Sequence, residues 1–157
     1  LIKSRKPRFL PATVKAIRYC LLSVLPDLSA ISTKKVVILG RSPMVGLPLS
    51  WWLESEGVKV TLLGSDTKNI SNFTKKADIL ISTTGHPGLI TGNMIKNNAI
   101  VIDSGSPVGD IVFDEVALKA SAITPVPGGV GPLTVVSLME NVVQSEDHTG
   151  LGKLLNI

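Results

Sequence analysis

The residues best suited to bind a ligand are Gly40, Arg41 and Ser42, which directly follow the apolar run Val36 to Leu39. An apolar run that ends in glycine and leads into a helical pattern predicts a buried strand, a tight turn and a helix start. A helix start carries unpaired N–H groups and the positive end of the peptide dipoles, and a guanidinium beside it can bind phosphate. The turn therefore predicts a nucleotide-phosphate site, although any strand-to-helix turn can use glycine for backbone reasons alone.

The next apolar run, Val58 to Leu63, ends in Gly64 and Ser65, at the spacing from the first turn that a βαβ unit requires. At this place a dinucleotide fold contacts the adenosine ribose, where an acid favours NAD and an arginine or serine accommodates the 2′-phosphate of NADP. Ser65, together with the arginine of the first turn, would attract that phosphate, whereas Asp66 would repel it. The residues alone leave the choice between NADP and NAD open.

Strands and helices alternate along the rest of the chain. We predict strands at 36–39, 58–63, 78–82, 99–102 and 122–123, and helices at 11–25, 49–56, 69–76, around 94, at 113–119 and at 133–143. Ser42 could cap the second helix with Pro43 at its first position, but Pro48 would then break a backbone bond. Thr13 is the predicted N-cap of the first helix, and 27–33 is predicted to be a linker.

This alternation predicts an α/β fold, a Rossmann-like doubly wound parallel sheet with helices on both faces. In such sheets ligands bind beyond the carboxyl ends of the strands. Those ends carry Gly40, Gly64, the loop Thr83 to Gly85, the loop Asp103 to Gly105 and the loop Pro125 to Gly129. Five loops of small residues at one edge favour a binding cleft, and we predict that Thr84 and Gly85 contact a cofactor there.

The stretch PVPGGVGP, Pro125 to Pro132, is the other unusual loop. Its prolines fix backbone angles while its glycines allow close approach, so it could form a rigid wall of the cleft; a tight strand-to-helix connection would need fewer glycines. His86 and His148 have no acid or cysteine partner at a recognisable spacing, and His86 is expected to be a turn residue. We therefore predict no catalytic residue and no metal site in this chain.

Length and composition limit the remaining alternatives. The chain has 157 residues, 44% of them hydrophobic, and a net charge of +4, which predicts one globular domain without a membrane span. Its one cysteine, Cys20, excludes an internal disulfide. The basic residues concentrate near the N-terminus without interleaved aromatics, so nucleic acid is not an expected partner. The expected location is cytoplasmic, or mitochondrial in a eukaryote, and the start at Leu1 is compatible with a processed product or a fragment.

Four stretches together, VVILGRSPMVGLP, VIDSG, VGDIVFDEV and ITPVPGGVGPLTVVSLMEN, resemble the C-terminal half of bifunctional methylenetetrahydrofolate dehydrogenase/cyclohydrolase. The resemblance runs from Phe9 to about Gln144. It implies a Rossmann domain that binds NADP, with NAD as the alternative because of the acid at position 66, and a folate substrate and a homodimer for the whole protein. It also implies three parts: a basic arm and interdomain helix at 1–33, the NAD(P)-binding domain at 34–144 and a loose tail at 145–157.

The same resemblance assigns residues to the two ligands. It places the cofactor on Gly40, Arg41 and Ser42, with Ser65 near the 2′-phosphate and Ser106 near the nicotinamide, and it places the folate beside Pro127, Gly128 and Gly129. The sequence departs from the family at the acid after Ser65, where the family has a basic residue, and in a shortened loop around Ser106.

A third departure concerns the reaction itself. The family's catalytic lysine lies in a Tyr-x-x-x-Lys motif of an N-terminal domain, and no lysine here matches that motif. We therefore expect the isolated chain to bind nucleotide weakly and to be inactive or nearly so. Two alternatives stay open: a shikimate-type Rossmann dehydrogenase, which PVPGGVGP argues against, and a non-enzymatic nucleotide-binding or assembly module.

Overall fold

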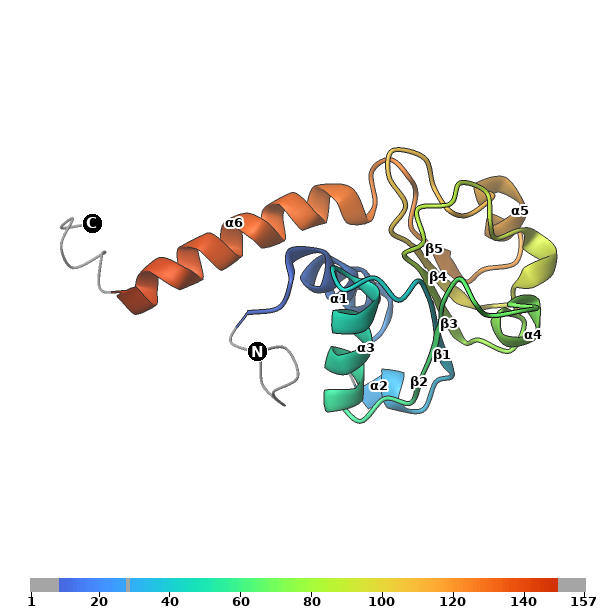
Figure 1. The fold of residues 1–157 in the computed structure, drawn as a ribbon, viewed down its shortest axis with the longest axis horizontal. Helices are drawn as coiled ribbons and strands as arrows, with labels where there is room; N and C mark the ends of the chain where they lie inside the picture. Colours follow the sequence, from blue (N-terminus) through green and yellow to red (C-terminus); the bar gives the residue numbers. More distant parts are fainter. Residues whose placement is uncertain (1–8, 28, 150–157) are drawn as a thin grey trace.

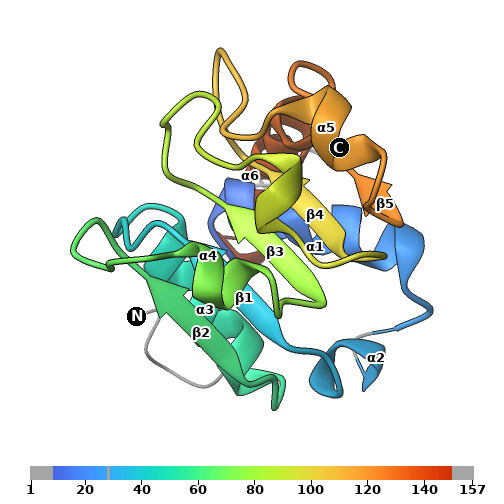
Figure 2. The same ribbon diagram turned by 90° about the vertical axis from the view of Figure 1, so that its right-hand side faces the viewer.

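The computed structural model describes residues 9–27 and 29–149. Five strands form one parallel sheet in the order β2-β1-β3-β4-β5 (Figures 1 and 2). Their bounds are β1 Val36–Leu39, β2 Val60–Leu63, β3 Ile79–Ser82, β4 Ile100–Asp103 and β5 Ala122–Ile123. Because β1 is followed by β2 on one side and β3 returns on the other, the strand order reverses between β1 and β3. Ligands of open parallel sheets bind at such a reversal.

The described residues contain seven helical segments: α1 Ala12–Val24, α2 Ser29–Ser32, α3 Gly46–Ser55, α4 Ser71–Thr74, the 3-10 turn η1 Gly92–Met94, α5 Phe113–Ala117 and α6 Val130–Thr149. Figure 2 shows α1 and α3 behind the sheet and α4 in front of it. In Figure 1, α6 extends far beyond the sheet as a single long helix, with α1 beneath its first half.

Alternate residues of the strands pack into two separate clusters, one on each face of the sheet. Val36 and Ile38 of β1 join the cluster formed with α1 and α3, whereas Val37 and Leu39 join the one formed with the segments around η1 and α5. All four residues are buried. A strand covered on both faces needs an uninterrupted apolar sequence, which explains the runs seen in β1, β3 and β4. The predicted doubly wound α/β fold is confirmed.

Residues 12–24, which form α1, pack into the hydrophobic core on one face of the sheet. Ile17 and Leu21 of α1 are fully buried in the same cluster as Leu49 and Leu53 of α3. The predicted cap Thr13 is wrong, since Pro11 occupies the N-cap position and no side chain caps the helix.

Other boundaries also differ from the sequence prediction. The helix α6 continues to Thr149, so the predicted loose tail is wrong up to that residue, and the remainder of that prediction lies outside the described residues. The predicted linker contains α2, and β2 begins two residues later than predicted, at Val60. The helix α3 begins at Gly46, which places Pro48 in its first turn, where no backbone hydrogen bond is lost.

Candidate functional site

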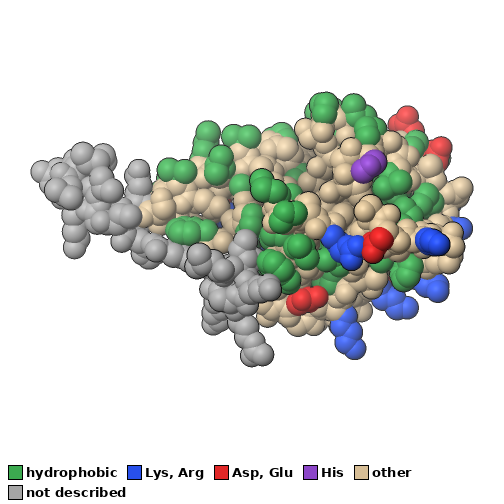
Figure 3. All heavy atoms as spheres, viewed as in Figure 1, with side chains coloured by type: hydrophobic (Ala, Val, Ile, Leu, Met, Phe, Trp, Pro, Cys, Tyr) green, Lys and Arg blue, Asp and Glu red, His purple; other side chains and the backbone are tan. Residues whose placement is uncertain are grey.

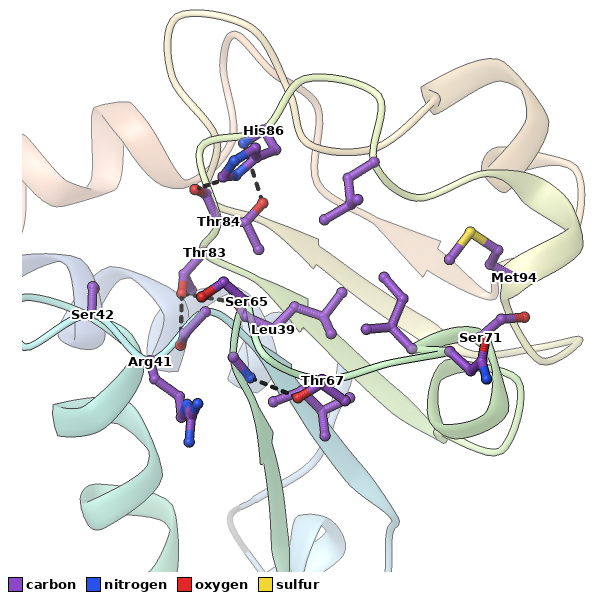
Figure 4. Close-up of a pocket in the computed structure, with 16 residues that line it drawn as sticks. Leu39, Arg41, Ser42, Ser65, Thr67, Ser71, Thr83, Thr84, His86 and Met94 are labelled. Carbon is purple, nitrogen blue, oxygen red and sulfur yellow. Dashed lines mark hydrogen bonds between the residues drawn. The ribbon is translucent and has the colours of Figure 1, made fainter.

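A cavity of about 860 Å³ opens at the carboxyl ends of β1, β2 and β3, where the strand order reverses (Figure 4). Each of these strand ends and the loops that follow contribute to its walls. The lining residues are Leu39, Gly40, Arg41, Ser42, Leu63, Gly64, Ser65, Thr67, Asn69, Ile70, Ser71, Thr83, Thr84, His86, Leu89 and Met94. The predicted cleft edge is therefore the edge that carries this cavity.

The turn after β1 is held in close contact with its neighbours. Gly40 has a φ of 103°, and a Cβ there would lie 2.6 Å from the carbonyl oxygen of Thr83. A Cβ at Gly46, the first residue of α3, would lie 1.8 Å from the carbonyl oxygen of Gly40. Neither space admits a side chain, so the start of α3 sits directly against the turn. Backbone can approach a ligand closely at such a turn.

Ser42 caps the turn that precedes α3. Its Oγ accepts a hydrogen bond from the Val45 N–H at 3.2 Å, and its carbonyl oxygen accepts one from the Leu47 N–H at 3.0 Å. The predicted arrangement, with Ser42 as N-cap and Pro43 as first helical residue, is wrong by one turn because Pro43 to Val45 form a separate turn.

Arg41 extends from the first turn toward the end of β2 instead of toward Thr84 and His86 (Figure 4). Its guanidinium lies over Gly64, where a Cβ would be only 2.1 Å from Nε. There it forms an ion pair with Asp66. The hydrogen bond from Arg41 is the main reason why the pKa of Asp66 is lower than its ordinary value.

The lining of the cavity combines polar and apolar side chains. Ser65 and Thr67 lie near the rim after β2, and the Thr67 hydroxyl accepts a hydrogen bond from the Gly64 N–H at 3.1 Å. The apolar side chains of the lining form what we call the apolar wall of the cavity: Leu39, Leu63, Ile70, Leu89 and Met94. A flat apolar group with hydroxyl and phosphate substituents matches such a mixed lining.

The loop after β3 is fixed by a buried acid. Asp110 Oδ2 accepts hydrogen bonds from the Thr84 N–H at 2.8 Å and the Thr84 hydroxyl at 2.9 Å. His86 follows, with Nδ1 3.0 Å from the Thr84 carbonyl oxygen. Gly85, between them, has a φ of 67° and is exposed, but it is not a lining residue.

The loop after β4 is organised by a second buried acid. Asp103 accepts hydrogen bonds from the N–H groups of Gly105, Asp110 and Ile111, at 2.8 to 3.1 Å. Burial raises the pKa of Asp103 despite these three donors. The carboxylate of Asp103 therefore organises this loop, a structural role that its burial and its three hydrogen-bond donors favour.

Neither Ser106, predicted to lie near the nicotinamide, nor the three predicted folate residues are among the residues that line the cavity. Ser106 is exposed in the loop between β4 and α5, and Pro127, Gly128 and Gly129 lie in the loop between β5 and α6. The two loops are neighbours, since a Cβ at Gly109 would be 3.3 Å from the Val126 side chain. In Figure 1 both loops rise beside each other at the same end of the sheet.

Metal-binding clusters and membrane-spanning helices are both absent from the described ranges 9–27 and 29–149. No three His, Cys, Asp or Glu residues gather there in a geometry that would hold a metal ion. Within the same ranges, no helix is long and apolar enough to cross a membrane.

The comparison with known families agrees with this geometry. Residues 11–149 match the model described as "Tetrahydrofolate dehydrogenase/cyclohydrolase, NAD(P)-binding domain". The chain belongs to this family. It is the family's NAD(P)-binding domain that the matched residues form, and α1, at the start of the match, is included in it.

Relatives of known sequence and structure match over most of the chain. It is 47% identical over 144 residues to the bifunctional protein FolD of Thermodesulfovibrio yellowstonii, covering 87% of this chain and 49% of that protein. The FolD structure from Campylobacter jejuni has a TM-score of 0.82 at 39% identity and covers 90% of this chain and 51% of that one. The Trypanosoma brucei enzyme, whose structure contains NADP and an inhibitor, has a TM-score of 0.85 at 36% identity and covers 94% and 55%. The chain thus spans about half the length of these relatives.

The structure brings together five of the predicted cofactor residues: Gly40, Arg41, Ser42, Ser65 and Thr84 line the cavity. It does not bring Gly85 or Ser106 into that lining. Sequence reasoning missed the apolar wall, and His86, expected to be only a turn residue, is also a lining residue. Leu39 and Leu63 end the first and second strands. For Ile70, His86, Leu89 and Met94 the available signal was their position after the second or third strand, within loops that a parallel sheet directs to the same edge.

Proposed function

We propose that this chain is the cofactor-binding half of an NADP-dependent methylenetetrahydrofolate dehydrogenase/methenyltetrahydrofolate cyclohydrolase. The observation that carries the proposal is the cavity at the ends of β1, β2 and β3, in a chain whose residues 11–149 match the family's NAD(P)-binding domain. The NADP found in the Trypanosoma brucei relative, which this chain resembles at a TM-score of 0.85, supports the choice of cofactor.

The residues present fit a dinucleotide. The turn at Gly40 leaves no room for a Cβ and lies directly against the start of α3, which is the arrangement of a strand, a tight turn and a helix start that holds a pyrophosphate. Arg41 and Ser65 would lie near the adenosine ribose, and the apolar wall would cover the adenine. When bound, the cofactor accepts a hydride from the folate methylene carbon. This chain would bind and orient the cofactor, and Thr84 and Gly85, which follow β3, would make further contacts with it.

The folate would lie on the other side of the same edge. Ser106 would face the nicotinamide, and Pro127, Gly128 and Gly129 would form a wall beside the folate. Both loops lie at the carboxyl ends of β4 and β5, next to the strands that carry the cavity. Cyclohydrolysis needs a positioned proton-transfer group, and no lysine of this chain matches the family motif that supplies it. We also propose that the protein assembles as a homodimer.

Binding is tested by calorimetric titration of the 157-residue chain with NADP. We expect saturable binding, and we expect Gly40→Val to abolish it, because a side chain at this position would collide with the Thr83 carbonyl. Glu54→Gln, on the exposed part of α3, is the control and should bind as the unchanged chain does. Absence of binding by NADP and by NAD alike would overturn the proposal.

Turnover is tested separately by following formation of the reduced cofactor from methylenetetrahydrofolate. We expect none with this chain alone. A chimaera that places the N-terminal half of the Thermodesulfovibrio yellowstonii relative before this chain should produce it. A chimaera that binds NADP yet does not turn over would favour the non-enzymatic nucleotide-binding module.

A further inference from the structure

The ion pair between Arg41 and Asp66 lies at the rim of the cavity and has no role in the fold described above. Both side chains are largely solvent-accessible, at 47% and 70% exposure. An exposed pair of this kind contributes little to stability. Its position is informative instead, because Arg41 is a lining residue at the end of β1, and Asp66 lies directly between the lining residues Ser65 and Thr67.

Two residues that follow β2 hold the side chain of Arg41 in its orientation. The lack of a side chain at Gly64 provides the space that the guanidinium fills, and the carboxylate of Asp66 pairs with its NH2 group. No Asp or Glu is among the lining residues of the cavity in the described part of the chain. Asp66 is therefore the acid that competes with a bound anion for Arg41.

NAD and NADP differ at the group that would meet this pair. The ribose of NAD carries a 2′-hydroxyl, which needs no cation, whereas NADP carries a phosphate there that is close to dianionic at neutral pH. A phosphate that binds Arg41 must either displace the carboxylate of Asp66 from the guanidinium or share the guanidinium with it, which brings two anions to one cation. The penalty applies to NADP and not to NAD.

We propose that Asp66 is a specificity-determining residue that lowers the affinity for NADP relative to NAD by holding the guanidinium of Arg41. The inference rests on the proposed function, since it assumes that the cavity binds the dinucleotide with its adenosine ribose at the end of β2. With Asp66 in place, this chain should bind NADP more weakly than the same chain with a neutral residue at position 66.

The test is to titrate the unchanged chain and Asp66→Asn with NADP and with NAD. We expect the variant to bind NADP roughly tenfold more tightly, an effect between those of one charge–charge interaction at short range in bulk water and near a protein surface. NAD affinity should change by less than about twofold, because its 2′-hydroxyl carries no charge. Glu54→Gln changes the net charge equally at an exposed position of α3 and should leave the ratio of the two affinities unchanged.

A second pair of variants tests the route through Arg41. In an Arg41→Gln chain, Asp66→Asn should shift the preference by no more than about twofold, because the two residues act as a coupled pair. A full tenfold shift in that background would overturn the inference. So would an unchanged preference after Asp66→Asn in a chain that binds both dinucleotides. Failure of both dinucleotides to bind the unchanged chain would instead be failure of the proposed function.

Discussion

Asp110 is a buried carboxylate that connects two loops at the ligand edge of the sheet. It lies just before α5, yet its Oδ2 accepts hydrogen bonds from Ser82 Oγ at 2.6 Å and from two groups of Thr84. It is fully buried, and Thr84 lines the cavity. One side chain therefore fixes the loop after β3 with respect to the connection that follows β4.

Replacing this acid should weaken both the fold and the site. In Asp110→Ala the three donors lose their acceptor, and hydrogen bonds to a charged group contribute enough that we expect a loss of about 3 kcal/mol in the free energy of unfolding. Asp110→Asn retains one acceptor oxygen and should lose about 1 kcal/mol. Urea denaturation measures both values.

Glu54→Ala is the matched control for this prediction, because it removes an exposed acid from α3 and should change stability by less than about 0.5 kcal/mol. If Asp110→Ala were no more destabilising than this control, the carboxylate would not be the link between the loops. The affinity for NADP should fall in parallel with stability, since Thr84 is then no longer held.

At the scale of elements, α1 and α6 are joined by polar groups. The Lys15 ammonium forms an ion pair with Glu140 at 2.7 Å, and the Tyr19 hydroxyl donates to the same carboxylate at 2.8 Å. Asn141 donates to the Leu10 carbonyl at 2.8 Å. These contacts anchor the first half of the long helix to the body of the domain.

This contact predicts a loss of stability in acid. The hydrogen bond from Lys15, followed by that from Tyr19, lowers the pKa of Glu140 below its ordinary value of 4.5. A group whose pKa is lowered in the folded state stabilises it fully above the ordinary pKa and loses that effect as the pH falls through the lowered one. Stability should thus fall below pH 4.5, as urea midpoints measured across this range would show.

The contribution of Glu140 is isolated by Glu140→Gln, which should be less stable at neutral pH and show a shallower acid decline. Because Asp66 and Asp78 also have lowered pKa values, some decline should remain. Glu54→Gln should retain the full slope. An unchanged slope in Glu140→Gln would mean that the ion pair with Lys15 does not form in solution.

The strands were predictable because a sheet covered on both faces requires apolar residues without interruption. This holds for β1, β3 and β4, whose residues are buried throughout. The edge strand β2 has exposed and half-exposed positions, and its start was misplaced because Val58 is buried without belonging to it. The length of α6 was underestimated because its final turns carry polar residues, which do not continue the apolar pattern that predicted the helix.

The site was predictable where it depends on strand ends and not where it depends on loop paths. Gly40 and Ser65 follow their strands directly, so parallel pairing alone places them at one edge. Leu89 and Met94 reach the cavity only through the course of the segment after β3. The pairing of Arg41 with Asp66 likewise depends on the empty space at Gly64, which no spacing rule reveals.

At the scale of the whole molecule, α6 exposes an apolar surface opposite the face that contacts α1. Six residues form it, each between 49% and 63% exposed: Val135, Val136, Leu138, Met139, Val142 and Val143. They recur at helical spacing along one side, and Figure 3 shows hydrophobic side chains along the upper edge of this helix. A row of this size is typical of a contact surface rather than of a solvated face.

For the isolated chain in solution, a second copy is the available partner for this surface. We expect concentration-dependent self-association, which fits the proposed homodimer, because burying the six side chains removes apolar area from water. Sedimentation velocity should show dimers whose fraction rises with concentration. Val135→Lys combined with Met139→Lys should leave monomers at concentrations where the unchanged chain is dimeric.

Leu118→Lys provides the comparison that decides whether the effect belongs to α6. Leu118 is 88% exposed at the end of α5, so the same substitution there changes hydropathy and charge without altering the apolar row. We expect it to sediment as the unchanged chain does. If this variant and the α6 double variant both became monomeric, added charge would be responsible. If neither did, the chain would associate through another surface, because the apolar row cannot remain buried with two lysines in it.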